Sequence, residues 1–338
     1  MNRLRMIVIW LSCSVVMVSA AQAQAADDEN FYAGKRITYL VSGEPGTGYD
    51  LYARLIARYM ERYLPRTRIR VQNVIVGGGG ILVANQVYAA NADGLTMATL
   101  NSGLIYSQLQ QLDGIRFRLQ DMTWIGKAGT DPRVIYTGSG SGLTSLQQLL
   151  ALPAPVLFAT VAGVGTSSYT DAVLIAAALG LEARMVTFAN SGEAHMSMLR
   201  GEVPVRIGSF SSAQRFVTSS GGHILAAVGN SPLLPPDLAN TYAHAAGPEG
   251  ERIMSIMEAV AEFSRFTVMP PGVPAERVAT LRSAYMSALA DPDLLAEAAS
   301  LDLPIEAMDG AALQQRIRDV LAQPPAVIEL LNATLQVP

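Results

Sequence analysis

Short apolar runs alternate with helical patterns along most of the chain, and this alternation constrains the fold more than any other feature. In SGEPGTGYDLYARLIARYM (residues 42–60), a glycine-rich turn follows the apolar run ITYLV and leads into a helix with one apolar stripe. Repeated strand–helix order predicts an α/β fold with mostly parallel sheets flanked by helices. The predicted strands are Ile37–Ser42, Ile69–Val74, Thr96–Leu100, Thr123–Ala128, Arg133–Thr137, Val156–Thr160, Arg184–Phe188, Val205–Ile207, His223–Val228 and Arg265–Met269.

Two of the strand-to-helix turns resemble each other. GEPGTGYDLYARLIA and AGVGTSSYTDAVLIA (residues 162–176) each have a Gly-Thr turn, then a Tyr and an Asp at the start of a helix. The repeat predicts two similar lobes, each presenting helix N-terminal N–H groups to a ligand between them. Alternatively, the likeness is one that any α/β protein with several such turns would show. Asp50 is predicted to cap and brace the first helix, while Ser168 and Asp171 fit a capping box.

Two further turns follow predicted strands. Gly77–Gly80 includes Gly78 and Gly79 and allows a close approach of backbone to a ligand, although a flexible surface turn fits equally well. Asn101 and Ser102 lie in the second turn and add polar donors.

The first 25 residues have the pattern of a secretory signal peptide. Arg3 and Arg5 precede an apolar segment, and small residues at 21, 23 and 25 provide cleavage sites after position 23 or 25. Cleavage removes two positive charges, so the net charge changes from −4 to about −6, which argues against a nucleic-acid partner. The single cysteine, Cys13, lies inside this segment. We therefore expect an exported, periplasmic protein without disulfides.

No catalytic pattern is present in the sequence. The chain lacks a phosphate-binding loop and a nucleophile elbow, and the possible dinucleotide turn at Gly46 has Leu51 in place of its third glycine. The three histidines do not have metal-ligand spacing, and His195 and His223 are interpreted as structural. The turns are instead rich in N–H and hydroxyl donors, which suit binding without reaction. We expect no enzyme activity, no cofactor and no metal.

Several motifs occur along the mature chain in the order found in a known family. They are Gly46-Thr47-Gly48-Tyr49-Asp50-Leu51-Tyr52-Ala53-Arg54, Gln72-Asn73 with Gly77–Gly80, Ala90-Asn91-Ala92-Asp93-Gly94-Leu95-Thr96, Gly163-Val164-Gly165-Thr166-Ser167-Ser168, Gly272-Val273-Pro274 with Val278 and Leu281, and Ala288–Pro292. Together they resemble the Bug family, the TctC-like periplasmic solute-binding receptors of tripartite tricarboxylate transporters.

The resemblance implies a two-lobed periplasmic-binding-protein (Venus flytrap) fold. Residues 31–127 with 232–338 would form one lobe and residues 128–231 the other, with the ligand in the cleft between them. The implied function is capture of a small carboxylate, a di- or tricarboxylate or an aromatic acid, by a monomer that delivers it to a membrane permease. The alternatives are a clamshell that signals to a membrane sensor protein and, less favoured, a secreted hydrolase.

The chain departs from the family pattern at the expected ligand site. Glu44 occupies a turn that usually reads P-F-A-A-G-G, and Thr187–Gly192 lacks the lysine of the family's P-Y-K-G segment. Glu44 could point away, repel a second carboxylate, or accept from a ligand hydroxyl or amine. The residues expected to contact the ligand are Glu44, Thr47, Gly48, Tyr49, Gly78, Gly79, Asn101, Ser102, Gly165, Thr166, Ser167, Ser168, Ser191, Ser209 and Phe210.

Overall fold

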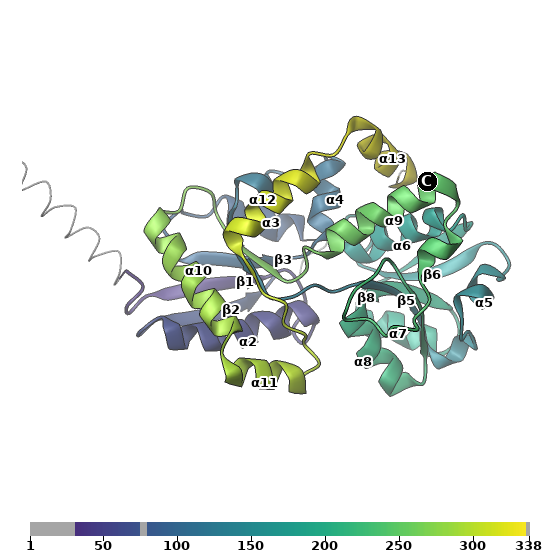
Figure 1. The fold of residues 1–338 in the computed structure, drawn as a ribbon, viewed down its shortest axis with the longest axis horizontal. Coiled ribbons are helices and arrows are strands. Elements are labelled where there is room, and N and C mark those ends of the chain that lie inside the picture. Colours follow the sequence, from purple (N-terminus) through teal and green to yellow (C-terminus); the bar gives the residue numbers. More distant parts are fainter. Residues whose placement is uncertain (1–30, 75–79, 336–338) are drawn as a thin grey trace, which may run out of the picture.

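The computed structural model describes residues 31–74 and 80–335. Two sheets lie side by side, each with helices on its faces (Figure 1). The first sheet has the order β11-β4-β10-β3-β1-β2 and the second the order β7-β6-β8-β5-β9. The strands of the first are β1 (Arg36–Val41), β2 (Arg68–Asn73), β3 (Thr96–Leu100), β4 (Thr123–Lys127), β10 (Phe266–Met269) and β11 (Met308–Asp309), and those of the second are β5 (Arg133–Thr137), β6 (Val156–Val161), β7 (Ala183–Phe188), β8 (Val205–Ser209) and β9 (His223–Ala227).

The two sheets share one topology. In the first sheet β2, β1 and β3 are parallel, β10 is reversed between β3 and β4, and β4 again points with β3. In the second sheet β7, β6 and β8 are parallel, with β5 reversed between β8 and β9. The expectation of two similar, mostly parallel lobes is therefore confirmed. Every predicted strand is present, with its ends shifted by at most two residues, and the short β11 was not predicted.

Helices cover both sheets. Those that accompany the first sheet are α2 (Gly48–Tyr63), α3 (Ile81–Tyr88), α4 (Gly103–Leu109), η1 (Leu119–Asp121), α10 (Ala275–Leu289), α11 (Pro292–Ser300) and α12 (Gly310–Leu321). Those that accompany the second are η2 (Ser139–Ser141), α5 (Leu146–Leu150), α6 (Ser167–Ala178), α7 (Ser191–Leu199), α8 (Phe210–Ser220), η3 (Thr241–His244) and α9 (Gly247–Ala261). The last helix, α13 (Pro325–Leu335), packs against α6.

The predicted lobe boundaries remain a prediction. The chain passes from β4 in the first sheet to β5 in the second through residues 128–132, next to the expected boundary at 127/128. On the return path, α9 packs against α6 before the chain enters β10. Residues 247–261 thus contact the second sheet's helices, although the expected division assigns them to the first lobe.

A buried ion pair joins the two chain segments that pass between the sheets. Asp131 lies between β4 and β5, and Arg265 directly precedes β10. The Arg265 guanidinium donates to the Asp131 carboxylate, and both side chains are only 4% exposed. Ser211, at the start of α8, donates its hydroxyl (2.7 Å) and its N–H (3.2 Å) to the same carboxylate. One acidic group therefore holds both crossing segments and a helix of the second sheet.

We expect Asp131→Asn to lower the free energy of unfolding by about 3 kcal/mol or more, because it leaves Arg265 buried without a counter-charge. Glu202→Gln makes the same chemical change in the exposed Arg200–Glu202 pair and should cost less than about 1 kcal/mol. Urea unfolding of both variants measures the difference. Equal, small losses would show that the pair does not hold the crossing segments.

Candidate functional site

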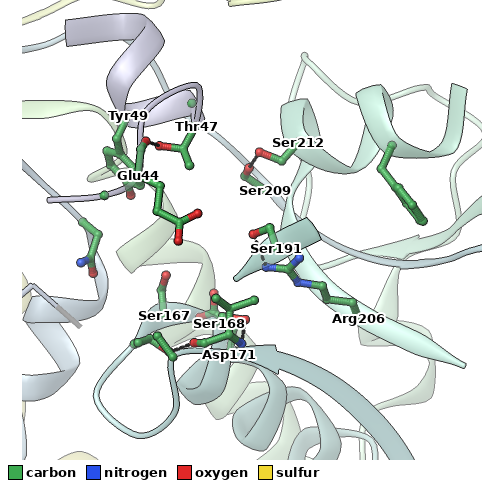
Figure 2. A pocket seen from close by; sticks show the side chains of 18 of the residues that line it. Glu44, Thr47, Tyr49, Ser167, Ser168, Asp171, Ser191, Arg206, Ser209 and Ser212 are labelled. Atoms are coloured by element: carbon green, nitrogen blue, oxygen red, sulfur yellow. Dashed lines mark hydrogen bonds between the residues drawn. The ribbon is translucent and has the colours of Figure 1, made fainter. Parts of the chain in front are cut away.

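A cavity of about 790 Å³ lies between the two sheets, with walls from both lobes (Figure 2). The β1–α2 turn and Asn101 line it from the first sheet. The β6–α6 turn and the starts of α7 and α8 line it from the second. Arg133, the first residue of β5, and Arg265, directly before β10, also line it. The two glycine-rich turns that resemble each other in sequence therefore contribute to one cavity.

The β1–α2 turn is shaped by Asp50 from within the first helical turn. Its carboxylate accepts from Gly46 N (2.8 Å) and from the side chains of Asn73 (2.9 Å) and Arg54 (2.9 Å). Gly46 has φ 79°, a left-handed conformation that favours glycine. The predicted brace is confirmed, but the predicted cap is wrong because Thr47 occupies the N-cap position.

The first N–H groups of α2 are available for a ligand. The first helical bond runs from Leu51 N to Thr47 O (2.9 Å), so the N–H groups of Gly48, Tyr49 and Asp50 precede it. Glu44 points into the cavity beside this turn (Figure 2). The same wall thus carries both a positive helix end and a carboxylate.

The β6–α6 turn is organised by hydroxyl groups. Thr166 caps α6 by accepting from Tyr169 N (3.2 Å) and donates to Gly163 O (2.7 Å). Ser168 accepts from Val161 N (3.1 Å). These two hydroxyls are engaged in local structure, whereas the Ser167 side chain faces the cavity (Figure 2). The predicted Ser168–Asp171 capping box is wrong, because Asp171 pairs with an arginine instead.

Arg133 lines the cavity and links the two lobes. Its guanidinium pairs with Asp171 on α6 (2.9 Å) and donates to Ser102 Oγ at the start of α4 (3.0 Å). Burial alone would lower the pKa of Arg133, but the Asp171 carboxylate raises it above its ordinary value, so the guanidinium stays charged. Nearby, a Cβ added to Gly103 would lie 2.8 Å from Ser167 N, so α4 and α6 approach closely here.

Arg206 and His195 form the wall on the second lobe. Arg206 Nη1 lies 3.3 Å from His195 Nε2, and the Tyr136 hydroxyl lies 3.3 Å from the same nitrogen. Arginine only donates, so Nε2 accepts and the ring proton is on Nδ1. Burial, followed by the charge of Arg206, lowers the pKa of His195 to about 4. The imidazole is therefore neutral near pH 7, and it stacks on Phe216 at 4.0 Å.

Most of the residues expected to contact a ligand line this cavity. Those that do are Glu44, Thr47, Gly48, Tyr49, Asn101, Thr166, Ser167, Ser168, Ser191 and Ser209. Ser102 is buried under Arg133, while Gly165 and Phe210 line two other hollows. Gly78 and Gly79 lie outside the described residues.

Sequence reasoning named Glu44 but missed the other ionisable residues of the cavity. Arg133, Arg206, Arg215 and Arg265 line it, as do Asp171 and His195. The sequence did contain a signal for two of these residues. Arg133 and Arg206 lie inside predicted strands, and buried strands rarely contain unpaired charges.

Neither a metal cluster nor a membrane-spanning helix is found in the described ranges. Within residues 31–74 and 80–335, no group of three or more His, Cys, Asp or Glu side chains is placed to hold a metal ion. The same ranges contain no helix long and apolar enough to cross a bilayer.

The chain matches known proteins over most of its length. Residues 52–333 match the model of the tripartite tricarboxylate transporter family receptor, TctC. The chain belongs to this family. It is 27% identical to the UPF0065 protein in the tcbD-tcbE intergenic region of Pseudomonas sp. strain P51, over 82% of this chain and 80% of that one.

Solved structures share the fold. The periplasmic binding protein BugD has a TM-score of 0.71 and 19% identity, covering 90% of this chain and 98% of that one. MatC (Rpa3494) of Rhodopseudomonas palustris, with bound malate, has a TM-score of 0.69 and 19% identity, covering 89% and 99%. The two-lobed periplasmic-binding-protein fold of this TctC receptor is thereby confirmed.

The low pKa of His195 predicts a pH-dependent stability. The folded state resists protonation of His195, whereas the unfolded chain accepts a proton near the ordinary value of 6.5. This contribution is intact above pH 6.5 and is lost as the pH falls toward 4. His195→Gln should therefore reduce the drop in melting temperature between pH 7 and pH 4.

The matched control is His223→Gln, which alters an exposed histidine. It should show the wild-type drop over the same pH range. The slopes are compared rather than the absolute melting temperatures, since the substitutions also change packing. A wild-type slope in His195→Gln would contradict the buried neutral imidazole.

Proposed function

We propose that this protein is an extracytoplasmic receptor that captures a small carboxylate between its lobes and delivers it to a tripartite tricarboxylate-type membrane permease. The observation that carries the proposal is the convergence of two helix N-termini, from α2 and α6, on one cavity. Family membership supports a receptor role, and the related fold of MatC holds malate.

The chemistry of the two turns supports a carboxylate ligand. Free N–H groups in the first helical turns donate to anions, and each helix contributes roughly half a positive charge at its N-terminus. Ser167 adds a hydroxyl on the cavity side of α6. Because the donors belong to different lobes, a ligand that contacts both stabilises the closed arrangement over the open one. The closed receptor would then dock on the permease.

The remaining parts of the proposal concern location and partners. A signal peptide within residues 1–25, outside the described residues, would direct the protein to the periplasm. Family membership supports a permease as the partner. We propose that the receptor acts as a monomer, without enzyme activity or cofactor.

Ser167→Asp tests the helix-terminus site directly. An aspartate in the first turn suits the helix dipole, so the fold should be retained, but its charge occupies the position of the ligand carboxylate. We expect carboxylate binding to fall by at least a hundredfold with no loss of melting temperature. Ser167→Asn has nearly the same shape without the charge and should stay within a few-fold of wild type.

Isothermal titration against a panel of mono- and dicarboxylates makes the measurement. Wild-type affinity in Ser167→Asp would exclude the α6 terminus as the carboxylate site. If the folded wild-type protein binds no member of the panel, the proposal of a carboxylate receptor is itself overturned.

Glu44→Gln tests the acidic group in the cavity. A second negative charge in the same cavity costs a bound carboxylate on the order of 1 kcal/mol at intermediate dielectric. We therefore expect the variant to bind dicarboxylates roughly fivefold more tightly. Weaker binding would instead mean that Glu44 accepts a hydrogen bond from the solute.

A further inference from the structure

A polar cluster on the second lobe is not used by the helix-terminus site. It consists of Arg206 on β8, Ser191 and His195 on α7, and Tyr136 on β5, and is called here the Arg206 cluster. Arg206 Nη2 donates to Ser191 Oγ (3.3 Å), and Nη1 donates to His195 Nε2 (3.3 Å). Arg206 reaches from β8 to Ser191 at the cavity, across from Glu44 (Figure 2).

Arg206 has no counter-charge in the described part of the chain. It is 9% exposed, and no carboxylate of those residues lies within 4.0 Å of it, whereas Arg133 and Arg265 each pair with an aspartate. Its Nε has no hydrogen-bond partner. A buried guanidinium with only neutral partners carries an uncompensated desolvation cost. A carboxylate that accepts two of its N–H bonds would offset that cost.

The charge balance of the cavity favours a ligand with two negative charges. The ion pairs with Asp171 and Asp131 neutralise Arg133 and Arg265. Arg206 and Arg215 then remain against Glu44 among the described lining residues, which leaves one net positive charge. The N-termini of α2 and α6 add about half a charge each. The sum, about +2, matches a dianion better than a monoanion.

Arg215 carries the same imbalance. Its guanidinium reaches Ser212 Oγ at 3.4 Å, and no carboxylate of the described residues lies within 4.0 Å of it. Burial, followed by the neighbouring Arg265, lowers the pKa of Arg215 below its ordinary value. A second anionic group on this side of the cavity would relieve both arginines.

We propose that Arg206 forms a second anion subsite, so that the solute is a dianion with one carboxylate at the helix N-termini and the other on the guanidinium. The subsite rests on the proposed function and adds the solute's second charge to it. His195 acts as a neutral acceptor that fixes the orientation of Arg206. Ser191 completes the contact from the start of α7.

Matched pairs of probes test the subsite. Succinate, glutarate, adipate and pimelate are each compared with their monomethyl esters, which keep one carboxylate and nearly the same length. Isothermal titration is performed with the wild type, Arg206→Met and Arg184→Met. Arg184 is an exposed arginine on β7 of the same sheet, so its variant makes the same charge change outside the cavity.

We expect the wild type to bind its best diacid at least tenfold more tightly than the monoester. Arg206→Met should lose at least tenfold in diacid affinity and stay within twofold for the monoester, so the preference disappears. Arg184→Met should behave as wild type. A general structural defect would weaken both probes equally and would not produce this split.

Three results would overturn the subsite. Equal binding of diacid and monoester by the wild type, which needs no variant, would exclude a second anion contact. If Arg206→Met keeps the preference for diacid over monoester, another group contacts the second carboxylate. In that case, loss of monoester binding in Ser167→Asp would still support the proposed function. If the folded wild-type protein binds none of the probes, both the proposed function and the subsite are overturned. Should Arg206→Met fail to fold, Arg206→Lys replaces it, with a smaller but still selective loss of diacid affinity.

Discussion

The Asp131–Arg265 ion pair is the interaction on which the rest of the molecule depends. It fixes the two segments that cross between the sheets to each other and, through Ser211, to α8. The guanidinium carbon of Arg265 also lies 4.5 Å from the centre of the Tyr49 ring. A Cβ added to Gly48 would lie 2.9 Å from Arg265 Nη2. The N-terminus of α2 therefore packs against the same arginine that joins the lobes, which couples the β1–α2 turn to the junction.

A second buried pair extends this arrangement across the cavity. Arg133, at the start of β5, pairs with Asp171 on α6 and donates to Ser102 at the N-cap of α4. The starts of helices from both lobes thus meet around one guanidinium. With these two arginines paired internally, Arg206 and Arg215 line the cavity with no carboxylate of the described residues within 4.0 Å.

Much of the fold was predictable because local physics specified it. Apolar periodicity and turn chemistry predict three features of the fold. These are the strands, the Gly-Thr turns at residues 46–47 and 165–166, and the apolar stripe of α2 with buried Leu55, Ile56 and Met60. The predictions failed where tertiary contacts competed with local ones. Asp171 was predicted as a cap, but Arg133, far away in sequence, provides a stronger partner. The interpretation of His195 as structural stays a prediction, but the spacing of the three histidines gave no sign that His195 lines the cavity.

The sequence by itself determined the α/β class, the two similar lobes and the two Gly-Thr turns that lead into helix N-termini. These depend on period, turn residues and motif order, which are local properties. Only the tertiary structure decided which charges meet. Arg133, Arg206 and Arg265 are alike in sequence as arginines in or beside buried strands, yet two find an aspartate and one does not. Their electrostatic roles depend on partners 38 to 134 residues away or absent from the described chain, a distance at which residue spacing carries no information.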